Sequence, residues 1–259
     1  MERSGFMKIL VTGAAGFIGS QLVEAALQRG HQVIGIDNFN AYYAPEIKRY
    51  HAQQIIASGC DLLELDLAHD DLRPYLDGIE IVYHSAAQPG ISSSIPFKSF
   101  ADNNIHATQH LLQALADVAS VERFVNIATS SIYGAMALAA EDAAPAPISY
   151  YGVTKLAAEQ LVMAAYRQQR FPATSLRLFS VYGPRERPDK LYPRVIRSIL
   201  DGVPFPLYAH SWQHKRSFTF VGDVVKALLL TLKMDACVGE IINVGTTESI
   251  STGQAIESP

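Results

Sequence analysis

The sequence lacks several features that would assign it to a specialised class of protein. Its 259 residues include only two cysteines, Cys60 and Cys237, and these lack the spacing of a metal site. They predict two free thiols in a reducing cytoplasm. A formal net charge of -4 at pH 7 gives no sign of a nucleic-acid or membrane partner attracted by bulk charge. No apolar run is long enough to span a bilayer.

The sequence does contain an alternation of short apolar runs and longer amphipathic segments, within a composition that is 49% hydrophobic. The apolar runs predict six buried parallel strands, at Lys8–Thr12, Gln32–Ile36, Cys60–Leu65, Ile79–His84, Arg123–Ala128 and Ala173–Leu178. The amphipathic segments predict helices at Phe17–Arg29, Ala44–Ser58, Phe100–Val118 and Ser149–Arg170. This order predicts an α/β fold with a doubly wound parallel sheet.

The character of the chain changes after Tyr182, where prolines interrupt a region of shorter elements. Two helices are expected in it, at Leu191–Asp201 and Val221–Leu232. We therefore expect residues 7–180 to form a nucleotide-binding domain and residues 181–259 a smaller substrate lobe, interwoven with the first domain. The lobe should lie at the carboxyl edge of the sheet, where open α/β sheets bind ligands.

A glycine-rich turn follows the first expected strand. The run Thr12–Gly19 sets Gly13, Gly16 and Gly19 in a Gly-x-x-Gly-x-x-Gly pattern. Glycine permits a tight turn and lets the backbone approach phosphate groups, and the helix that follows offers free N–H groups at its positive end. A purely structural turn is the alternative, but the spacing after a strand favours a site for a dinucleotide pyrophosphate.

Acidic residues follow the next two expected strands. Asp37 ends the second, where a carboxylate accepts hydrogen bonds from both ribose hydroxyls and repels a 2′-phosphate, so we predict NAD rather than NADP. Asn38, rather than an arginine, at the next position agrees. Asp66 and Leu67 follow the third strand and are candidates to contact the adenine, while a helix N-cap is an equal reading of Asp66.

Tyr151 and Lys155 stand four residues apart in an expected helix, so they share one face. We expect the Lys155 ammonium to lower the pKa of Tyr151 and to bond the nicotinamide ribose, which makes Tyr151 a base near neutral pH. Thr129, Ser130 and Ser131 end the fifth expected strand, where a hydroxyl can orient the substrate. A Tyr-x-x-x-Lys spacing without other signals is usually a solvated pair of side chains on a helix surface. In a dinucleotide-binding fold it predicts hydride chemistry on an alcohol carbon.

Together these motifs resemble the NAD-dependent epimerase/dehydratase family of extended short-chain dehydrogenases/reductases, which act on nucleotide sugars. The resemblance covers nearly the whole chain and is carried by Val11–Leu22, His84–Gln88, Thr129–Gly134, Tyr151–Glu159 and Leu176–Asp189. It implies a Rossmann sheet, an NAD cofactor and a UDP-sugar substrate, and no metal.

The resemblance also implies roles for single residues. Thr129 matches the family's catalytic Ser/Thr, and Tyr151 with Lys155 matches the base and its partner. Arg216 resembles the arginine that holds the nucleotide diphosphate, and Arg187 resembles one that lines the sugar pocket. Further cofactor contacts would be Ala15, Phe17, Ile18, Ala86, Ala87, Gln88 and Asn104. Further substrate contacts would be Ser94, Ser130, Ser131 and Ser180.

The residues after Thr129 separate the reactions of the family. Sugar dehydratases of this family place Asp-Glu there, and UDP-glucuronate decarboxylases place a Glu where Ser131 stands. Small hydroxyls such as Ser130 and Ser131 resemble the 4-epimerases, in which a keto-sugar must rotate. Ser180 stands where glucuronate enzymes often carry Thr and glucose enzymes Asn. The resemblance thus implies C4 epimerisation of a UDP-sugar, with UDP-glucuronate as the first candidate.

Two alternatives stay open at this point. One is another nucleotide-sugar oxidoreductase or dehydratase, and the other is an inactive NAD-binding protein with a shortened substrate lobe. The second arises because the chain stops at Pro259, before the last segment of the family's substrate lobe. The run Gly90–Ser94 also lacks an arginine that epimerases often carry, and Ala209–Lys215 replaces a Gly-Asp-Gly type of turn. Ser217 stands where the family usually has Asp.

Family members commonly dimerise through their two long helices, here Phe100–Val118 and Ser149–Arg170, so we expect a cytoplasmic homodimer. An ordinary core stripe is an equal reading of the apolar residues concerned, which are Leu111, Leu112, Leu115, Leu161 and Val162.

Overall fold

The computed structural model describes residues 5–90, 94–135, 138–207 and 211–257. Its centre is a seven-stranded parallel sheet in the order β3-β2-β1-β4-β5-β6-β10. The strands are β1 (Lys8–Thr12), β2 (Gln32–Asp37), β3 (Asp61–Glu64), β4 (Ile81–His84), β5 (Arg123–Thr129), β6 (Ala173–Leu178) and β10 (Ile241–Val244). The prediction of a doubly wound parallel sheet is confirmed, and β10 adds a strand that the sequence pattern did not indicate.

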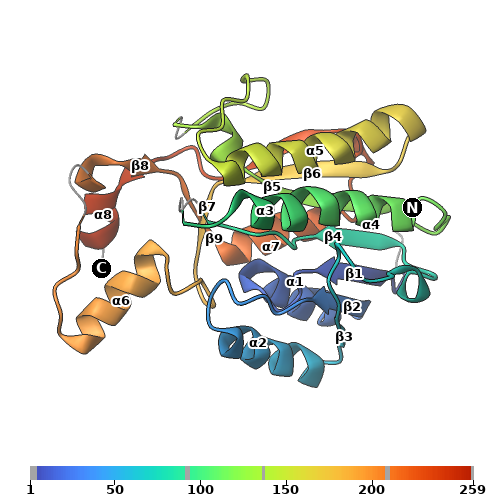
Figure 1. Cartoon of the computed structure of the whole chain (residues 1–259), viewed down its shortest axis with the longest axis horizontal. Helices are drawn as coiled ribbons and strands as arrows, with labels where there is room; N and C mark the ends of the chain where they lie inside the picture. The colour runs from blue at the N-terminus through green and yellow to red at the C-terminus, as the bar shows by residue number, and fades with distance from the viewer. Residues whose placement is uncertain (1–4, 91–93, 136–137, 208–210, 258–259) are drawn as a thin grey trace.

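Helices cover both faces of the sheet (Figure 1). One face carries α1 (Phe17–Leu27), α2 (Pro45–Ala57) and α7 (Val221–Leu230). The other carries α4 (Ala107–Leu115) and α5 (Tyr150–Gln169). Neighbouring strand residues alternate between the two cores, so β1 reads as a continuous apolar run that is buried on both sides.

The predicted helix Phe100–Val118 is a continuous helical segment in three parts, which runs from Phe97 to Leu115. It starts as α3 (Phe97–Phe100), passes through a π-helix at Ala101–His106 and continues as α4. A π-helical turn holds an extra residue and often marks a functional site. Single-turn 3-10 helices lie at Arg73–Tyr75, Ser130–Tyr133, Ser211–Gln213 and Asp235–Cys237.

The later part of the chain forms a smaller lobe and then returns to the sheet. Short strands pair β7 with β9 and β8 with β11, and α6 and α8 lie to the left of the sheet in Figure 1. The elements are β7 (Ser180–Tyr182), α6 (Leu191–Asp201), β8 (Lys215–Arg216), β9 (Phe218–Phe220), β11 (Ile250–Ser251) and α8 (Thr252–Glu257). Between them α7 and β10 belong to the main body, so the two parts are interwoven, and the division at residue 180 stays a prediction.

The strand order reverses between β1 and β4, which creates a crevice at the carboxyl ends of the strands. The glycine-rich turn after β1, the segment after β4 and the hydroxyls after β5 all meet this edge. No helix in the described part of the chain is long and apolar enough to cross a membrane. The same residues contain no group of three or more His, Cys, Asp or Glu that could hold a metal ion.

Candidate active site

The glycine-rich turn is closed by contacts that only glycine allows. Gly13 has φ +68°, and a Cβ there would lie 2.8 Å from the backbone nitrogen of Ala86. A Cβ on Gly19 would lie 2.1 Å from the carbonyl oxygen of Gly13. Gly16 is the N-cap of α1, and no side chain caps this helix end in the described residues. The first-turn amides of Phe17 and Ile18 are therefore available to an anion such as a pyrophosphate.

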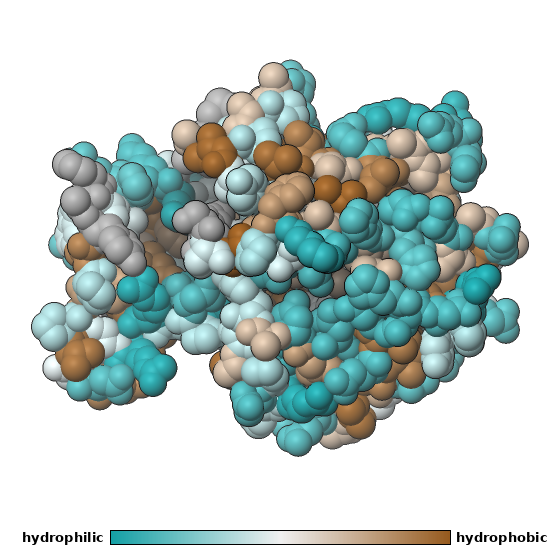
Figure 2. Space-filling model, viewed as in Figure 1, coloured by the Kyte–Doolittle hydropathy of each residue, from teal (hydrophilic) through white to brown (hydrophobic). Residues whose placement is uncertain are grey.

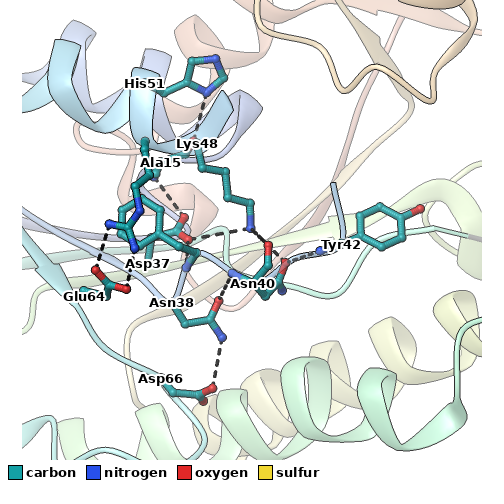
Figure 3. A network of polar contacts seen from close by, with 11 residues as sticks. Ala15, Asp37, Asn38, Asn40, Tyr42, Lys48, His51, Glu64 and Asp66 are labelled. Carbon is teal, nitrogen blue, oxygen red and sulfur yellow. Dashed lines mark hydrogen bonds and ion pairs between the residues drawn. The ribbon is translucent and has the colours of Figure 1, made fainter. Parts of the chain in front are cut away.

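The Asp37 carboxylate lies under this turn with its oxygens already engaged (Figure 3). Its Oδ2 accepts a bond from Ala15 N at 3.1 Å and its Oδ1 a bond from Phe39 N at 2.8 Å. The side chain is 7% exposed. The Ala15 amide thus holds Asp37, and contact of Ala15 with the cofactor stays a prediction. A carboxylate has about four lone-pair sites, so Asp37 keeps capacity for ribose hydroxyls.

Lys48 belongs to the same network and was not found by sequence reasoning. Its ammonium lies 4.0 Å from Asp37 and donates to the carbonyl oxygen and Oδ1 of Asn40 at 3.1 and 3.0 Å. Burial lowers the pKa of Lys48, and Asp37 opposes this. The sequence signal that could have identified Lys48 is its position on the buried face of α2, which it shares with His51 and Ile55.

Asn38 and Asp66 lie side by side, with Asn38 Nδ2 donating to Asp66 Oδ2 at 3.1 Å. Asp66 begins a turn rather than a helix, since its Oδ1 accepts from Ala68 N at 2.9 Å and no helix starts at this point. Leu67 is buried, and its carbonyl oxygen accepts from His110 Nδ1 at 2.7 Å. Asn38 and Asp66 thus meet beyond the ends of β2 and β3, and their contact with adenine stays a prediction.

The segment after β4, which includes Ala86 and Ala87, is fastened to α5 by Asn104. Asn104 Oδ1 accepts from Gln88 N at 2.7 Å. Asn104 Nδ2 donates to Gln88 O at 3.2 Å and to Thr154 Oγ1 at 2.9 Å. Because Thr154 lies between Tyr151 and Lys155 in α5, this fastening sets the predicted cofactor segment against the predicted catalytic helix.

The predicted catalytic residues come together where β5 ends. Thr129 Oγ1 accepts from Ser131 N at 3.1 Å and so caps the 3-10 turn Ser130–Tyr133. A Cβ on Gly152 would lie 2.7 Å from the carbonyl oxygen of Ser131, so glycine lets the first turn of α5 approach that turn. Tyr151 precedes this glycine, and Thr129 is near enough to lower its pKa.

The electrostatics of the pair differ from the sequence expectation. Burial raises the pKa of Tyr151, and the groups that lower it are Thr129 and Arg187 rather than Lys155. Lys155 is 2% exposed and donates from Nζ to Ile127 O at 2.7 Å. Burial lowers its pKa to about 8, against the opposing effect of Glu159. The ammonium of Lys155 is turned toward the β5 backbone, and an effect of Lys155 on the pKa of Tyr151 stays a prediction.

Arg187 lies between the two lobes and is 8% exposed. Its guanidinium stacks on the Tyr42 ring at 5.0 Å and pairs with Asp189 at 3.2 Å. Since Arg187 lowers the pKa of Tyr151, its charge acts on the catalytic centre. The residue spacing after β2 did not predict that Tyr42 would contact this arginine.

The other predicted substrate residues are spread around the lobe. Ser180 lies in β7, where its amide donates to Ser217 O at 3.1 Å. Arg216 is exposed in β8, near enough to Lys190 to lower its pKa together with Arg187. Ser131 accepts from Thr129 Oγ1 at 3.2 Å, Ser130 is part of the same turn, and Ser94 is exposed before α3.

Two departures noted in the sequence fall partly outside the described residues, at 91–93 and at 209–210. The rest of the second segment contacts α8, because a Cβ on Gly253 would lie 2.4 Å from the Trp212 ring and Thr252 N donates to His214 O at 2.9 Å. Trp212 therefore packs on the lobe.

The comparisons with known proteins agree with this geometry. The model of the NAD dependent epimerase/dehydratase family matches residues 9–245. The chain is 38% identical to an uncharacterized UDP-glucose epimerase, YtcB, of Bacillus subtilis, over 95% of this chain and 78% of that protein. It is 32% identical to UDP-glucuronate 4-epimerase 1 of Arabidopsis thaliana, over 97% of this chain and 63% of that one.

Among solved structures, the chain resembles the UDP-glucuronic acid 4-epimerase of Bacillus cereus in complex with UDP-glucuronic acid and NAD. The TM-score is 0.90 and the identity 38%, over 95% of this chain and 80% of that one. The chain therefore spans about two thirds to four fifths of the length of these relatives.

Proposed function

The chain belongs to the NAD dependent epimerase/dehydratase family, and on that premise we propose that it epimerises C4 of a UDP-sugar, with UDP-glucuronate as the first substrate. The observation that carries this proposal is the group Thr129, Tyr151 and Lys155 at the end of β5, next to small hydroxyls and without a carboxylate. Relatives named as 4-epimerases of UDP-glucuronate support it.

The residues around the crevice fit NAD. The uncapped N-terminus of α1 suits a pyrophosphate, and a Cβ on Gly13 or Gly19 would collide with backbone in the turn that must lie against it. Asp37 would hold the adenosine ribose and disfavour a 2′-phosphate. When bound, NAD supplies the acceptor and then the donor for the hydride of C4.

Tyr151 is the proposed acid–base group of the reaction. Its phenolate oxygen takes the proton of the 4-hydroxyl as the C4–H bond breaks, and it returns the proton when that bond re-forms on the other face. Thr129, which lowers the pKa of Tyr151, would orient the substrate hydroxyl. Lys155, charged below its pKa of about 8, would bond the nicotinamide ribose at neutral pH.

The small hydroxyls that follow Thr129 favour epimerisation over elimination. An elimination requires its own acid and base, as in dehydratases. In the described residues the groups that act on the pKa of Tyr151 are Thr129 and Arg187, and no carboxylate is among them. Ser130 and Ser131 are small, which leaves room for a 4-keto sugar to turn between the two half-reactions.

The charges of the lobe support an anionic substrate. Arg187 lies near Tyr151, where it would meet a substituent close to C4, such as the carboxylate of a uronate. Arg216 is exposed on β8, where it would meet the diphosphate. Ser180, in β7, would donate to the same carboxylate.

The proposal includes a homodimer in the cytoplasm. The buried, unpaired Cys60 and Cys237 fit a reducing compartment. Leu111, Leu115 and Val162 are buried in the core, so they do not form the interface. Apolar side chains that do face outward gather over α3 and the start of α5 (Figure 2). They are Phe97, Ile148, Tyr150 and Val153, exposed by 48, 78, 55 and 44%.

The test is an NMR time course of the purified protein with NAD and UDP-glucuronate, with UDP-glucose and UDP-N-acetylglucosamine in parallel. We expect the C4 epimer to form without net NADH. A Tyr151→Phe variant should lose a factor of about 100 to 10,000 in kcat while it keeps its affinity for NAD, because only the proton transfer is removed. Accumulation of NADH, or near wild-type turnover by the variant, would contradict the proposal.

A further inference from the structure

A buried chain of hydrogen bonds joins the glycine-rich turn to the catalytic helix. Thr12, His84, Thr108, Asn104 and Thr154 form it, and none is more than 1% exposed. His84 is its centre, with Nδ1 2.8 Å from Thr12 Oγ1 and Nε2 2.9 Å from Thr108 Oγ1. The two threonines come from β1 and α4, so the ring of His84, at the end of β4, bridges the sheet and the helix layer.

The partners of the threonines determine which ring nitrogen carries the proton. Thr108 Oγ1 lies 2.6 Å from the carbonyl oxygen of Asn104, which only accepts, so the Thr108 hydroxyl donates its proton there. Thr108 Oγ1 must therefore accept from His84, and the proton of the ring is on Nε2. Nδ1 is then an acceptor and takes the proton of the Thr12 hydroxyl.

Both ends of the chain continue in a consistent direction. Thr12 Oγ1, having donated to His84, accepts from Ala86 N at 3.2 Å. At the other end Asn104 Nδ2 donates to Thr154 Oγ1 at 2.9 Å, and Thr154 donates to Tyr150 O at 2.8 Å. Thr154 also lies 3.2 Å from Tyr151 O, so every hydroxyl proton in the chain has an acceptor. A second proton on His84 would meet Thr12 Oγ1, which already accepts from Ala86 N.

The charges around the ring also require it to be neutral. Burial, together with the charge of Lys155, lowers the pKa of His84 to about 3. Phe124 of β5 lies beside the ring, with centroids 6.0 Å apart. In the described residues Lys155 is the one charged group that acts on His84.

We propose that His84 is a positioning residue, which as a neutral ring protonated on Nε2 holds the glycine-rich turn and the Tyr151–Lys155 helix in one register. The bond from Ala86 to Thr12 keeps the segment after β4 against Gly13, where the cofactor is expected. The bonds through Asn104 keep Thr154, and with it the first turn of α5, in place. The role in turnover rests on the proposed function, whereas the state of the ring does not.

The state of the ring is tested on the whole protein labelled with ¹⁵N-histidine, by long-range ¹H–¹⁵N correlation from pH 5 to 9. His84 is assigned by its loss in a His84→Gln variant. We expect an Nε2–H tautomer whose shifts do not change over this range. An Nδ1–H tautomer, or titration of the ring, would overturn the proposal whether or not the protein turns over any sugar.

The positioning role is tested with His84→Phe, which keeps a ring beside Phe124, and with Thr108→Val, which cuts the same chain. Each variant should weaken NAD binding about tenfold and lower kcat per bound NAD at least tenfold. Each should also shift the acid limb of the pH–rate profile to higher pH. The double variant should be no worse than the poorer single one, because both break one chain. His84→Gln, which offers a donor and an acceptor, should recover most of the loss.

Two matched controls remove a buried hydrogen bond elsewhere. Thr174→Val removes the bond to Cys237 O, and Tyr83→Phe removes the bond to Leu228 O from the strand that carries His84. Both should keep the wild-type pH profile and NAD affinity. If His84→Phe merely lowers the melting temperature as these do, with the profile and kcat per bound NAD unchanged, His84 is structural only. If the wild type turns over no sugar, the NAD affinities and the tautomer still decide the matter.

Discussion

Lys155 carries its ammonium in a place that disfavours charge. It is 2% exposed, and its hydrogen-bond acceptor is a backbone carbonyl oxygen rather than a carboxylate. Glu159, one turn further along α5, opposes the effect of burial, but its carboxylate is paired with Arg177 at 2.7 Å. The charged ammonium that the proposed chemistry requires therefore lowers the stability of the folded protein, as is common at active sites.

This cost predicts that Lys155→Met stabilises the protein without cofactor while it abolishes epimerisation. The pKa of Lys155 is about 8 in the folded state against 10.5 for the free side chain, so the unfolded chain binds more protons between these values. Stability of the wild type should therefore rise with pH from 8 to 10.5, and the full penalty, roughly 3 kcal/mol, applies below pH 8. After the loss of the bond to Ile127, a net gain of about 1–2 kcal/mol should remain at pH 7.

The measurement is urea unfolding of both proteins at pH 7 and pH 10.5. Lys155→Met should be the more stable protein at pH 7 and the less stable one at pH 10.5, where the penalty is gone and only the loss of the bond to Ile127 remains. Lys226→Met, which removes an ammonium that is 73% exposed, is the control and should change stability little at either pH. A destabilised Lys155→Met protein at pH 7 would show that burial of the ammonium costs less than its hydrogen bond contributes.

At the scale of elements, the site depends on how closely α5 approaches the 3-10 turn that follows β5. Gly152→Ala should disturb this contact, since the added Cβ would lie 2.7 Å from Ser131 O and 3.0 Å from Pro147 Cβ, neither at the end of a flexible side chain. The helix would gain about 0.5–1 kcal/mol from alanine, but the turn and helix must separate. We expect kcat to fall at least tenfold with NAD affinity nearly unchanged.

The control for this variant is Val153→Ala, at the next position in the same helix, where the side chain is 44% exposed and no such contact exists. Steady-state kinetics and NAD titration of the two variants separate the effects. Equal kcat values for Gly152→Ala and wild type would mean that the spacing between α5 and the turn does not position Tyr151.

The sequence predicted the regular elements well because their signals are local. Buried parallel strands are continuous apolar runs, and the glycine spacing of the cofactor turn lies within eight residues. Strand β10 was not indicated by its own residues, because Ile241–Val244 is short and follows a long excursion through the lobe. The π-helix was equally invisible, since it differs from the surrounding α-helix only in its hydrogen bonds.

The site was predictable only where one motif carries it. Tyr151 and Lys155 are spaced within one helix, so their shared face could be read directly. The direction of the Lys155 ammonium toward Ile127 could not, because it depends on how β5 and α5 are packed. Lys48 and Tyr42 were missed for the same reason. Lys48 contacts Asp37 from another element, and Tyr42 contacts Arg187 of the smaller lobe.

At the scale of the whole molecule, the chain leaves the sheet after β6, builds the lobe around β7, β9 and α6, and returns to add α7 and β10. Arg187 and Tyr42 join the lobe to the cofactor side, and Arg185 pairs with Glu24 of α1 at 2.7 Å. Because these contacts cross between the two parts, occupancy of the cofactor site and order in the lobe should be coupled.

The surface of the whole molecule predicts how two copies associate. Phe97 and Tyr150 form an edge-to-face pair with centroids 5.3 Å apart. Val153 in the first turn of α5 and Ile148 just before this helix are also exposed. A monomer that exposed these side chains together would leave a contiguous apolar area in water. In a homodimer with a two-fold axis through this face, the patches of the two copies would pack against each other and become buried.

We therefore expect sedimentation equilibrium to give twice the mass of one chain. Val153→Asp should weaken the dimer at least about 100-fold, or about 3 kcal/mol, because the new carboxylate would be desolvated in the interface. Ile199→Asp, on the exposed face of α6 at 73% exposure, tests the competing apolar surface with the same change. Dissociation by Ile199→Asp but not by Val153→Asp would move the interface to α6. A monomeric wild type would remove the dimer from the proposal while leaving the chemistry of Tyr151 untouched.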